Sequence, residues 1–188
     1  MKDCKSICEK QKKFSGDEIR YEACTVKIGN FTLHLPAMNF RKDVQIFPLF
    51  YSWEGQAYRF MLYHVAANLL DGGIETIVVS KNSVYHITGF ENCDAAEEKM
   101  KDILSLYEKG LREPLLFFKK SSLAAYKVFR NEAATAVNGK WNAYQSPERN
   151  DYKKFYDCDL PAPDIVWDNA QKFFCEFQVE ETEKGKNK

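Results

Sequence analysis

The chain has 188 residues, of which 45% are hydrophobic and 14% aromatic, so it is long and apolar enough to bury one sizeable core. Lysine plus arginine and aspartate plus glutamate both number 27, which excludes the bulk positive field of a free-standing nucleic-acid binder. The six cysteines form no CxxC pair and no apolar leader follows Met1, so we expect a reduced, cytoplasmic compartment.

The N-terminal residues 1–18 are polar and rich in lysine, and they predict a short helix or a frayed arm. Cys4 and Cys8 lie one helical turn apart, as one side of a zinc site would. No second ligand pair accompanies them, so plain thiols are favoured. Two β-branched and aromatic runs within residues 19–35 flank Gly29-Asn30 and predict a hairpin.

The middle of the chain mixes strand and helix signals. Pro36 and residues 39–43 predict a loop, and residues 44–53 predict a strand that Pro48 displaces toward an edge or a bulge. Apolar residues at helical spacing then predict a helix over residues 58–70, which the Asp-Gly-Gly sequence ends. The next two apolar runs, residues 74–79 and 84–87, predict a second hairpin.

The strongest helical pattern covers residues 93–111, where apolar side chains recur every three or four positions. The predicted buried stripe includes Met100, Tyr107 and Leu111, and the predicted solvated face includes Lys99. Gly110 stands where a left-handed C-terminal cap is expected, before Pro114. The four apolar residues that follow Pro114 predict a buried extended segment.

The C-terminal third predicts a helix over residues 121–133, an irregular connection over 138–164 and a last helix over 165–177. The charged tail, residues 179–188, is expected to be disordered. The order of these elements predicts an α/β fold with a mixed central sheet flanked by helices. We therefore expect one domain over residues 19–178, between the N-terminal arm and the tail.

A search for catalytic motifs finds no GxSxG, no HExxH and no glycine-rich phosphate loop. The fold class admits a PD-(D/E)xK nuclease, which needs carboxylates on strands to hold Mg²⁺ and a lysine two residues after one of them. On the strand after Gly73 the nearest approximation is Val79-Ser80-Lys81, in which a valine replaces the carboxylate. No catalytic residue, metal site or cofactor is therefore predicted.

Basic residues gather around Pro114 and the start of the next helix, where Phe117, Phe118 and Tyr126 interleave with them. This composition suits a phosphate-backbone or partner surface, but a solvated helix start above a packed core is the favoured interpretation. The candidate contact residues are Arg112, Lys119, Lys120, Lys127 and Arg130.

The same region carries a resemblance to a known family. Residues 107–118 read YEKGLREPLLFF, and a helix that ends in AANLLDGG precedes a strand upstream of them. These segments, with the closing region from Tyr152 to Phe177, resemble the C-terminal domain of RecC, the gamma subunit of exodeoxyribonuclease V. Lys119 departs from the pattern, since the family commonly carries proline or glutamate after the aromatic pair.

The resemblance implies a PD-(D/E)xK nuclease fold without its metal-binding carboxylates. It implies a fragment of a longer gamma subunit, with RecB-like and RecD-like subunits as partners and DNA reached through the assembled helicase-nuclease. The expected role is subunit assembly and DNA handling in ATP-dependent double-strand-break repair and homologous recombination.

Two other functions remain open from the residues. One is an active Mg²⁺-dependent nuclease with rearranged ligands, for which Asp71, Glu75 and Lys81 are the candidates. The other is a single-stranded DNA binding module that uses the basic residues named above.

Overall fold

The computed structural model describes residues 2–14, 18–41, 43–49, 58–113, 163–175 and 179–184, together with residues 115, 117, 122, 123, 126 and 177. The chain divides into two compact units, the first formed by Met1–Lys101 and Phe177–Lys188 and the second by Asp102–Glu176. The single domain over residues 19–178 stays a prediction, because compactness does not show whether either unit folds independently.

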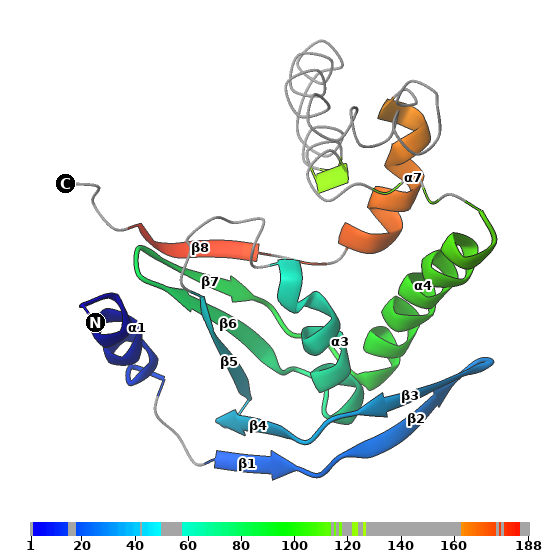
Figure 1. The fold of residues 1–188 in the computed structure, drawn as a ribbon. Coiled ribbons are helices and arrows are strands. Elements are labelled where there is room, and N and C mark those ends of the chain that lie inside the picture. Colours follow the sequence, from blue (N-terminus) through cyan, green and yellow to red (C-terminus); the bar gives the residue numbers. More distant parts are fainter. Residues whose placement is uncertain are drawn as a thin grey trace. The chain divides into compact units, whose positions relative to one another are not determined.

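The first unit contains a mixed sheet that is six-stranded over the described residues and has the order β1-β4-β5-β6-β7-β8 (Figure 1). Its strands are β1 (Glu18–Tyr21), β4 (Met38–Arg41), β5 (Val44–Leu49), β6 (Glu75–Ser80), β7 (Ser83–Ile87) and β8 (Val179–Lys184). The β5 and β6 strands are parallel, and the other neighbours are antiparallel. This arrangement confirms the predicted α/β class with a mixed sheet.

A separate hairpin forms from β2 (Cys24–Ile28) and β3 (Phe31–Leu35), as predicted. Gly29 has a φ of +55°, which a glycine adopts without steric cost at a tight turn. Pro48 was predicted to place its strand at an edge or a bulge. In the structure it lies in β5 and pairs in register with Val79 of β6. On the other side of β5, the pairing with β4 reaches only Val44, so the prediction is confirmed in part.

Two helices cover opposite faces of the sheet. The helix α1 (Lys2–Gln11) packs Ile7 against Ile77 and Val79 of β6. The helix α3 (Met61–Leu70), which follows the 3₁₀ turn η1 (Tyr58–Phe60), instead bonds Thr76 of the same strand through His64. Since successive side chains of a strand point to opposite faces, α1 and α3 lie on different sides of β6.

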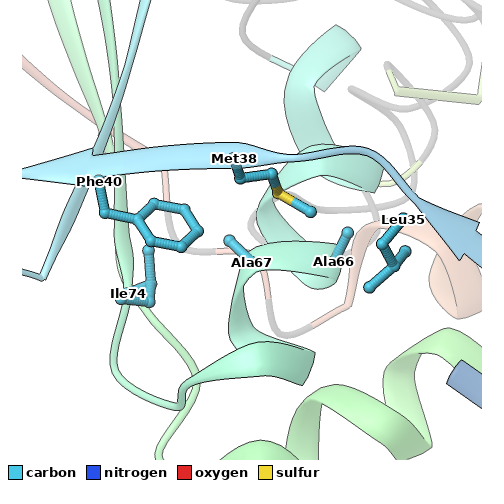
Figure 2. Packing of buried hydrophobic residues seen from close by; sticks show 6 residues of the cluster. All are labelled: Leu35, Met38, Phe40, Ala66, Ala67 and Ile74. Atoms are coloured by element: carbon cyan, nitrogen blue, oxygen red, sulfur yellow. The ribbon is translucent and has the colours of Figure 1, made fainter. Parts of the chain in front are cut away.

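A hydrophobic cluster joins α3 to the strands that precede it. Figure 2 shows Met38 of β4 and Leu35 at the end of β3 directed toward Ala66 and Ala67 of α3. Phe40 and Ile74 complete the buried set. The two alanines present a small surface, which lets the strand side chains approach the helix closely.

The turn after α3 is held by a buried asparagine. The side-chain amide of Asn68 donates to the carbonyl oxygens of His64 and Ile74, both at 2.9 Å. Its Oδ1 accepts from the backbone N–H groups of Ile74 and Phe90 at 3.0 and 3.1 Å. One side chain therefore ties the end of α3 to the start of β6 and to the segment after β7.

Two predicted irregular segments are strands instead. The predicted loop over residues 39–43 is largely β4, which pairs with β1 over four residues. The predicted disorder of the tail is wrong for residues 179–184, which form β8 beside β7. The physical reason in both cases is non-local pairing: charged side chains are tolerated on a strand when its backbone groups are satisfied by a neighbour.

The long helix α4 (Cys93–Arg112) contributes residues 93–101 to the first unit and residues 102–112 to the second. It runs two residues past Gly110, the predicted C-terminal cap, because Gly110 keeps helical backbone; among the described glycines only Gly29 and Gly73 have positive φ. Lys99, predicted on the solvated face, is 1% exposed. Its Nζ lies 4.9 Å from the ring centroid of Phe177, a cation-π contact inside the first unit.

In the second unit, an aromatic cluster packs against α7 (Pro163–Phe174). Phe117 contacts Phe173 and Phe174 with ring centroids 5.1 and 5.7 Å apart, and Tyr126 stacks on Trp167 at 5.8 Å. The described part of the predicted helix at 121–133 is helical at residues 122, 123 and 126. The irregular connection predicted before α7 lies outside the described residues.

Candidate functional site

The predicted contact surface is described at one of its five residues. Arg112 is the last residue of α4, and its side chain is 76% exposed. The other four candidates, Lys119, Lys120, Lys127 and Arg130, lie outside the described residues. The candidate contact site is therefore described by the residues in the C-terminal turns of α4.

Acidic neighbours pair with the cations at this end of α4. The guanidinium Nη2 of Arg112 donates to Oε1 of Glu108, one turn earlier. The Nζ of Lys109 lies 3.6 Å from Oε1 of Glu113 in the same i,i+4 relation. These four charges cancel, so this surface carries little of the positive potential that a DNA backbone requires.

Two large apolar side chains are exposed beside these ion pairs. Tyr107 is 57% and Leu111 is 68% exposed. They follow Met100 and Leu104 by seven residues each, which places them on the same face of the helix. Met100 and Leu104 are buried, so the apolar face of α4 extends from its buried turns into the exposed C-terminal turns. The prediction that Tyr107 and Leu111 belong to the core is wrong.

The three candidate ligands for a rearranged nuclease site do not converge. Glu75 is engaged by His86, with 2.5 Å between its Oε1 and Nδ1, and Asp71 accepts a 2.9 Å hydrogen bond from the hydroxyl of Tyr21. Lys81 follows the other end of β6, about 20 Å from Glu75 at about 3.3 Å per strand residue. Nowhere in the described part of the chain do three potential metal-ligating side chains gather.

A buried polar array lies between α3 and the sheet. The Nδ1 of His64 is 2.9 Å from Oγ1 of Thr76, and that hydroxyl donates to Oε1 of Gln45 at 3.5 Å. Burial lowers the pKa of His64 to about 4, and an opposing interaction with the backbone of Thr88 only partly offsets it. His64 is thus a neutral packing histidine. The sequence analysis did not predict a role for Asn68. Its only signal in the sequence is that it is a polar residue within the apolar face of a predicted helix.

A comparison with protein families relates the chain to known proteins. The family model described as the RecC C-terminal domain matches residues 16–130, more than half of the chain. The chain belongs to the RecC C-terminal domain family. The match runs from β1 through α4 and so includes Arg112, Tyr107 and Leu111. No curated protein matches the chain.

Membership in the RecC family links the chain to the gamma subunit of exodeoxyribonuclease V, to DNA repair and to partners in the RecBCD complex. The match begins nearer the N-terminus than the resemblance in the sequence suggested, and it leaves α7 and β8 outside. None of the described helices of this RecC domain combines the length and the hydropathy needed to cross a membrane.

Proposed function

We propose that this RecC-type domain is a non-catalytic part of the gamma subunit of a RecBCD-type exodeoxyribonuclease V. Its role is to support assembly with the RecB-like and RecD-like subunits and DNA handling during ATP-dependent double-strand-break repair and homologous recombination. The proposed location is the cytoplasm, which is supported by the free thiols of the five described cysteines.

The exposed end of the α4 stripe is the observation that carries the assembly role. Tyr107 and Leu111 continue a buried apolar row into solvent, and Arg112 is held beside them by Glu108. Tyrosine and arginine are among the residues that most often dominate protein–protein interfaces. We call Tyr107, Leu111 and Arg112 the α4 end surface.

A nuclease-like fold without a working site is the second part of the proposal. The parallel pair β5 and β6, the antiparallel β7 and the helices on both faces are compatible with a PD-(D/E)xK ancestor. The support for inactivity is that Lys81 lies about 20 Å from Glu75 along β6, at about 3.3 Å per strand residue, and that Glu75 and Asp71 each have a protein partner.

Assembly is tested by mixing the chain with its cognate RecD-like subunit and measuring the complex by sizing chromatography and titration calorimetry. The variant Tyr107→Ser/Leu111→Ser should weaken the complex at least tenfold, because it removes the exposed apolar area. Leu62→Ser/Tyr63→Ser is the matched control, since these α3 residues are 50% and 48% exposed. Equal losses in both variants, or no complex with the wild type, would contradict the proposal.

Inactivity is tested with linear DNA in the presence of Mg²⁺ or Mn²⁺. We expect no cleavage above a no-protein control. Cleavage that Glu75→Ala abolishes, and that Glu22→Ala leaves intact, would instead establish the rearranged nuclease. Glu22 is a suitable control because it is exposed and pairs with Arg20, away from β6.

A further inference from the structure

The helix α1 covers an apolar face of the sheet with few contacts of its own. Among the α1 side chains that the structure describes, residues 4–11, only Ile7 is buried, at 3% exposure. A single side chain therefore anchors α1 in the core of the first unit. Five aliphatic side chains on three neighbouring strands form the face beneath it, which we call the α1 face: Val44, Ile46, Ile77, Val79 and Val84.

Phe14, which follows α1, makes the second contact with the sheet. Its ring meets that of His86 edge-on, with the centroids 6.0 Å apart, and its carbonyl oxygen accepts from Nη1 of Arg41 at 3.2 Å. His86 is itself held by Glu75 of β6. These contacts are exposed or half-buried, so each of them adds little to the docking of α1.

The length of α1 makes its helical structure depend on docking. It has ten residues, fewer than the roughly 12–15 that an isolated helix needs to be even marginally stable in water. Weakly anchored terminal segments also open more often than the whole fold unfolds. We therefore expect α1 to leave the sheet, and to lose its helical structure, while the sheet stays folded.

The family match separates α1 from the face that it covers. All five residues of the α1 face lie within the matched residues 16–130, whereas α1 and Phe14 precede them. The cover of this face thus comes from a segment outside the match to the RecC domain. When that segment leaves, an apolar face of the matched domain is exposed for another helix.

The pairing of the strands beneath α1 restricts what can replace it. The strand β6 is paired with β5 and β7, and β7 is paired with β6 and β8, so their backbone groups are already satisfied. An extended peptide can add no strand there, and an aliphatic surface offers no charge to a phosphate. A helix that presents a branched aliphatic side chain, as α1 presents Ile7, is the complementary ligand.

We propose that α1 is a displaceable arm, and that a helix of the partner subunit with a branched aliphatic residue in the place of Ile7 replaces it on the α1 face during assembly. The inference rests on the assembly role proposed above and adds a regulatory step to it: docked α1 lowers the affinity of the chain for its partner. The α1 face belongs to the first unit, and the α4 end surface belongs to the second.

The first test is whether α1 can be replaced in trans. A fluorescein-labelled peptide of residues 1–14 is titrated into the full chain and into its Ile7→Ser variant. The variant should bind the peptide at least tenfold more tightly than the wild type, because its own arm competes less. A peptide carrying Ile7→Ser should not bind, and the chain variant Cys8→Ser, at an exposed site on the same helix, should behave as the wild type. Equal affinities of Ile7→Ser and the wild type would overturn the inference.

Hydrogen exchange of the Ile7→Ser chain measures whether the sheet stays folded without the arm. The amides of α1 should lose their protection, and those of β6 and β7 should keep it. Loss of protection in β6 as well would show that α1 is an integral part of the fold, and the inference would then be wrong.

The last test measures assembly by calorimetric titration with the cognate RecD-like subunit. Ile7→Ser should bind at least tenfold more tightly than the wild type, and an excess of the free peptide should reduce this affinity. Unchanged or weaker binding by the variant would overturn the inference, although the proposed function would stand. If neither chain binds the subunit, the proposed function fails, and with it the use of the α1 face by a partner; the peptide titration then shows separately whether α1 leaves the face.

Discussion

His64 is a buried side chain whose protonation should make the stability of the fold depend on pH. It lies on α3 between Thr76 and the rings of Phe90 and Phe177, whose centroids are 5.3 and 6.0 Å from its own. Its Nε2 has no hydrogen-bond partner among the residues that the structure describes. A charged imidazole would be poorly solvated there, and this is why burial lowers its pKa.

We predict that His64 makes the chain unstable in acid. Its pKa is about 4 when folded and 6.5 when unfolded, so the unfolded state binds more protons between these values. The contribution of His64 to the free energy of unfolding is present in full above pH 6.5. It is lost as the pH falls toward 4, and the loss is about 3 kcal/mol. Urea denaturation from pH 7 to pH 4.5 checks this against His64→Asn, which should lose that part of the pH dependence. His34→Asn, at an exposed site, should retain it; equal profiles for all three proteins would refute the prediction.

Asn68 should contribute a large share of the stability for a side chain of its size, because it makes four buried hydrogen bonds. Replacement by alanine leaves the N–H groups of Ile74 and Phe90 and the carbonyl of Ile74 buried without that partner. We expect the free energy of unfolding to fall by about 3–5 kcal/mol. Asn92→Ala is the control, because Asn92 only caps α4 through the N–H of Ala95 at 2.9 Å and should cost about 1 kcal/mol. Similar losses from both variants would refute the special role of Asn68.

At the scale of elements, the glycines after α3 set how closely two segments approach. A Cβ on Gly72 would lie 2.6 Å from Cα of Asn92, and backbone atoms cannot move aside. We expect Gly72→Ala to lower the free energy of unfolding by about 2–3 kcal/mol. Gly29→Ala meets open space and should cost only the strain of positive φ, about 1 kcal/mol. Chemical denaturation compares the two, and a smaller effect at Gly72 would contradict the close approach.

The β8 strand leads to a truncation experiment. Its pairing with β7 spans Ser83 to Ile87, and the hydroxyl of Ser83 donates to Oε1 of Glu181 at 2.6 Å. Removal of residues 179–188 should expose the edge of β7, lower the stability by about 3 kcal/mol or more and promote aggregation. Removal of residues 185–188 alone is the control and should change neither. Thermal unfolding and light scattering measure both; equal behaviour of the two truncations would mean that β8 adds no stability.

These elements also show what local sequence patterns predict and where they stop. The β2–β3 hairpin, α3 and α4 were predictable because turn residues and helical spacing act within one segment. The strands β4 and β8 were not, since each depends on a distant partner that no local pattern reveals. At the candidate site, the exposure of Arg112 followed from its charge. The exposure of Tyr107 and the burial of Lys99 depend on which turns of α4 are covered, and this is a tertiary property.

At the scale of the whole molecule, charge balance argues against DNA binding by the chain alone. Basic and acidic residues are equal in number, so no net field attracts a polyanion. The described cations at the end of α4 are matched by Glu108 and Glu113.

We therefore predict weak binding of single-stranded DNA, with a Kd of about 10⁻⁴ M or weaker at physiological salt. Fluorescence anisotropy of a labelled oligonucleotide between 50 and 200 mM salt should give a shallow dependence of log K on log salt. The variant Glu108→Gln/Glu113→Gln frees Arg112 and Lys109 from their partners, so it should bind more tightly and with a steeper slope. Glu97→Gln/Glu98→Gln, which frees only Lys101 near the middle of the same helix, adds the same charge and is the control. Tight wild-type binding with a steep slope would instead favour the single-stranded DNA module. A gain confined to the Glu108 and Glu113 variant would place a latent phosphate contact at the end of α4, where Glu108 and Glu113 neutralise Arg112 and Lys109 in the wild type.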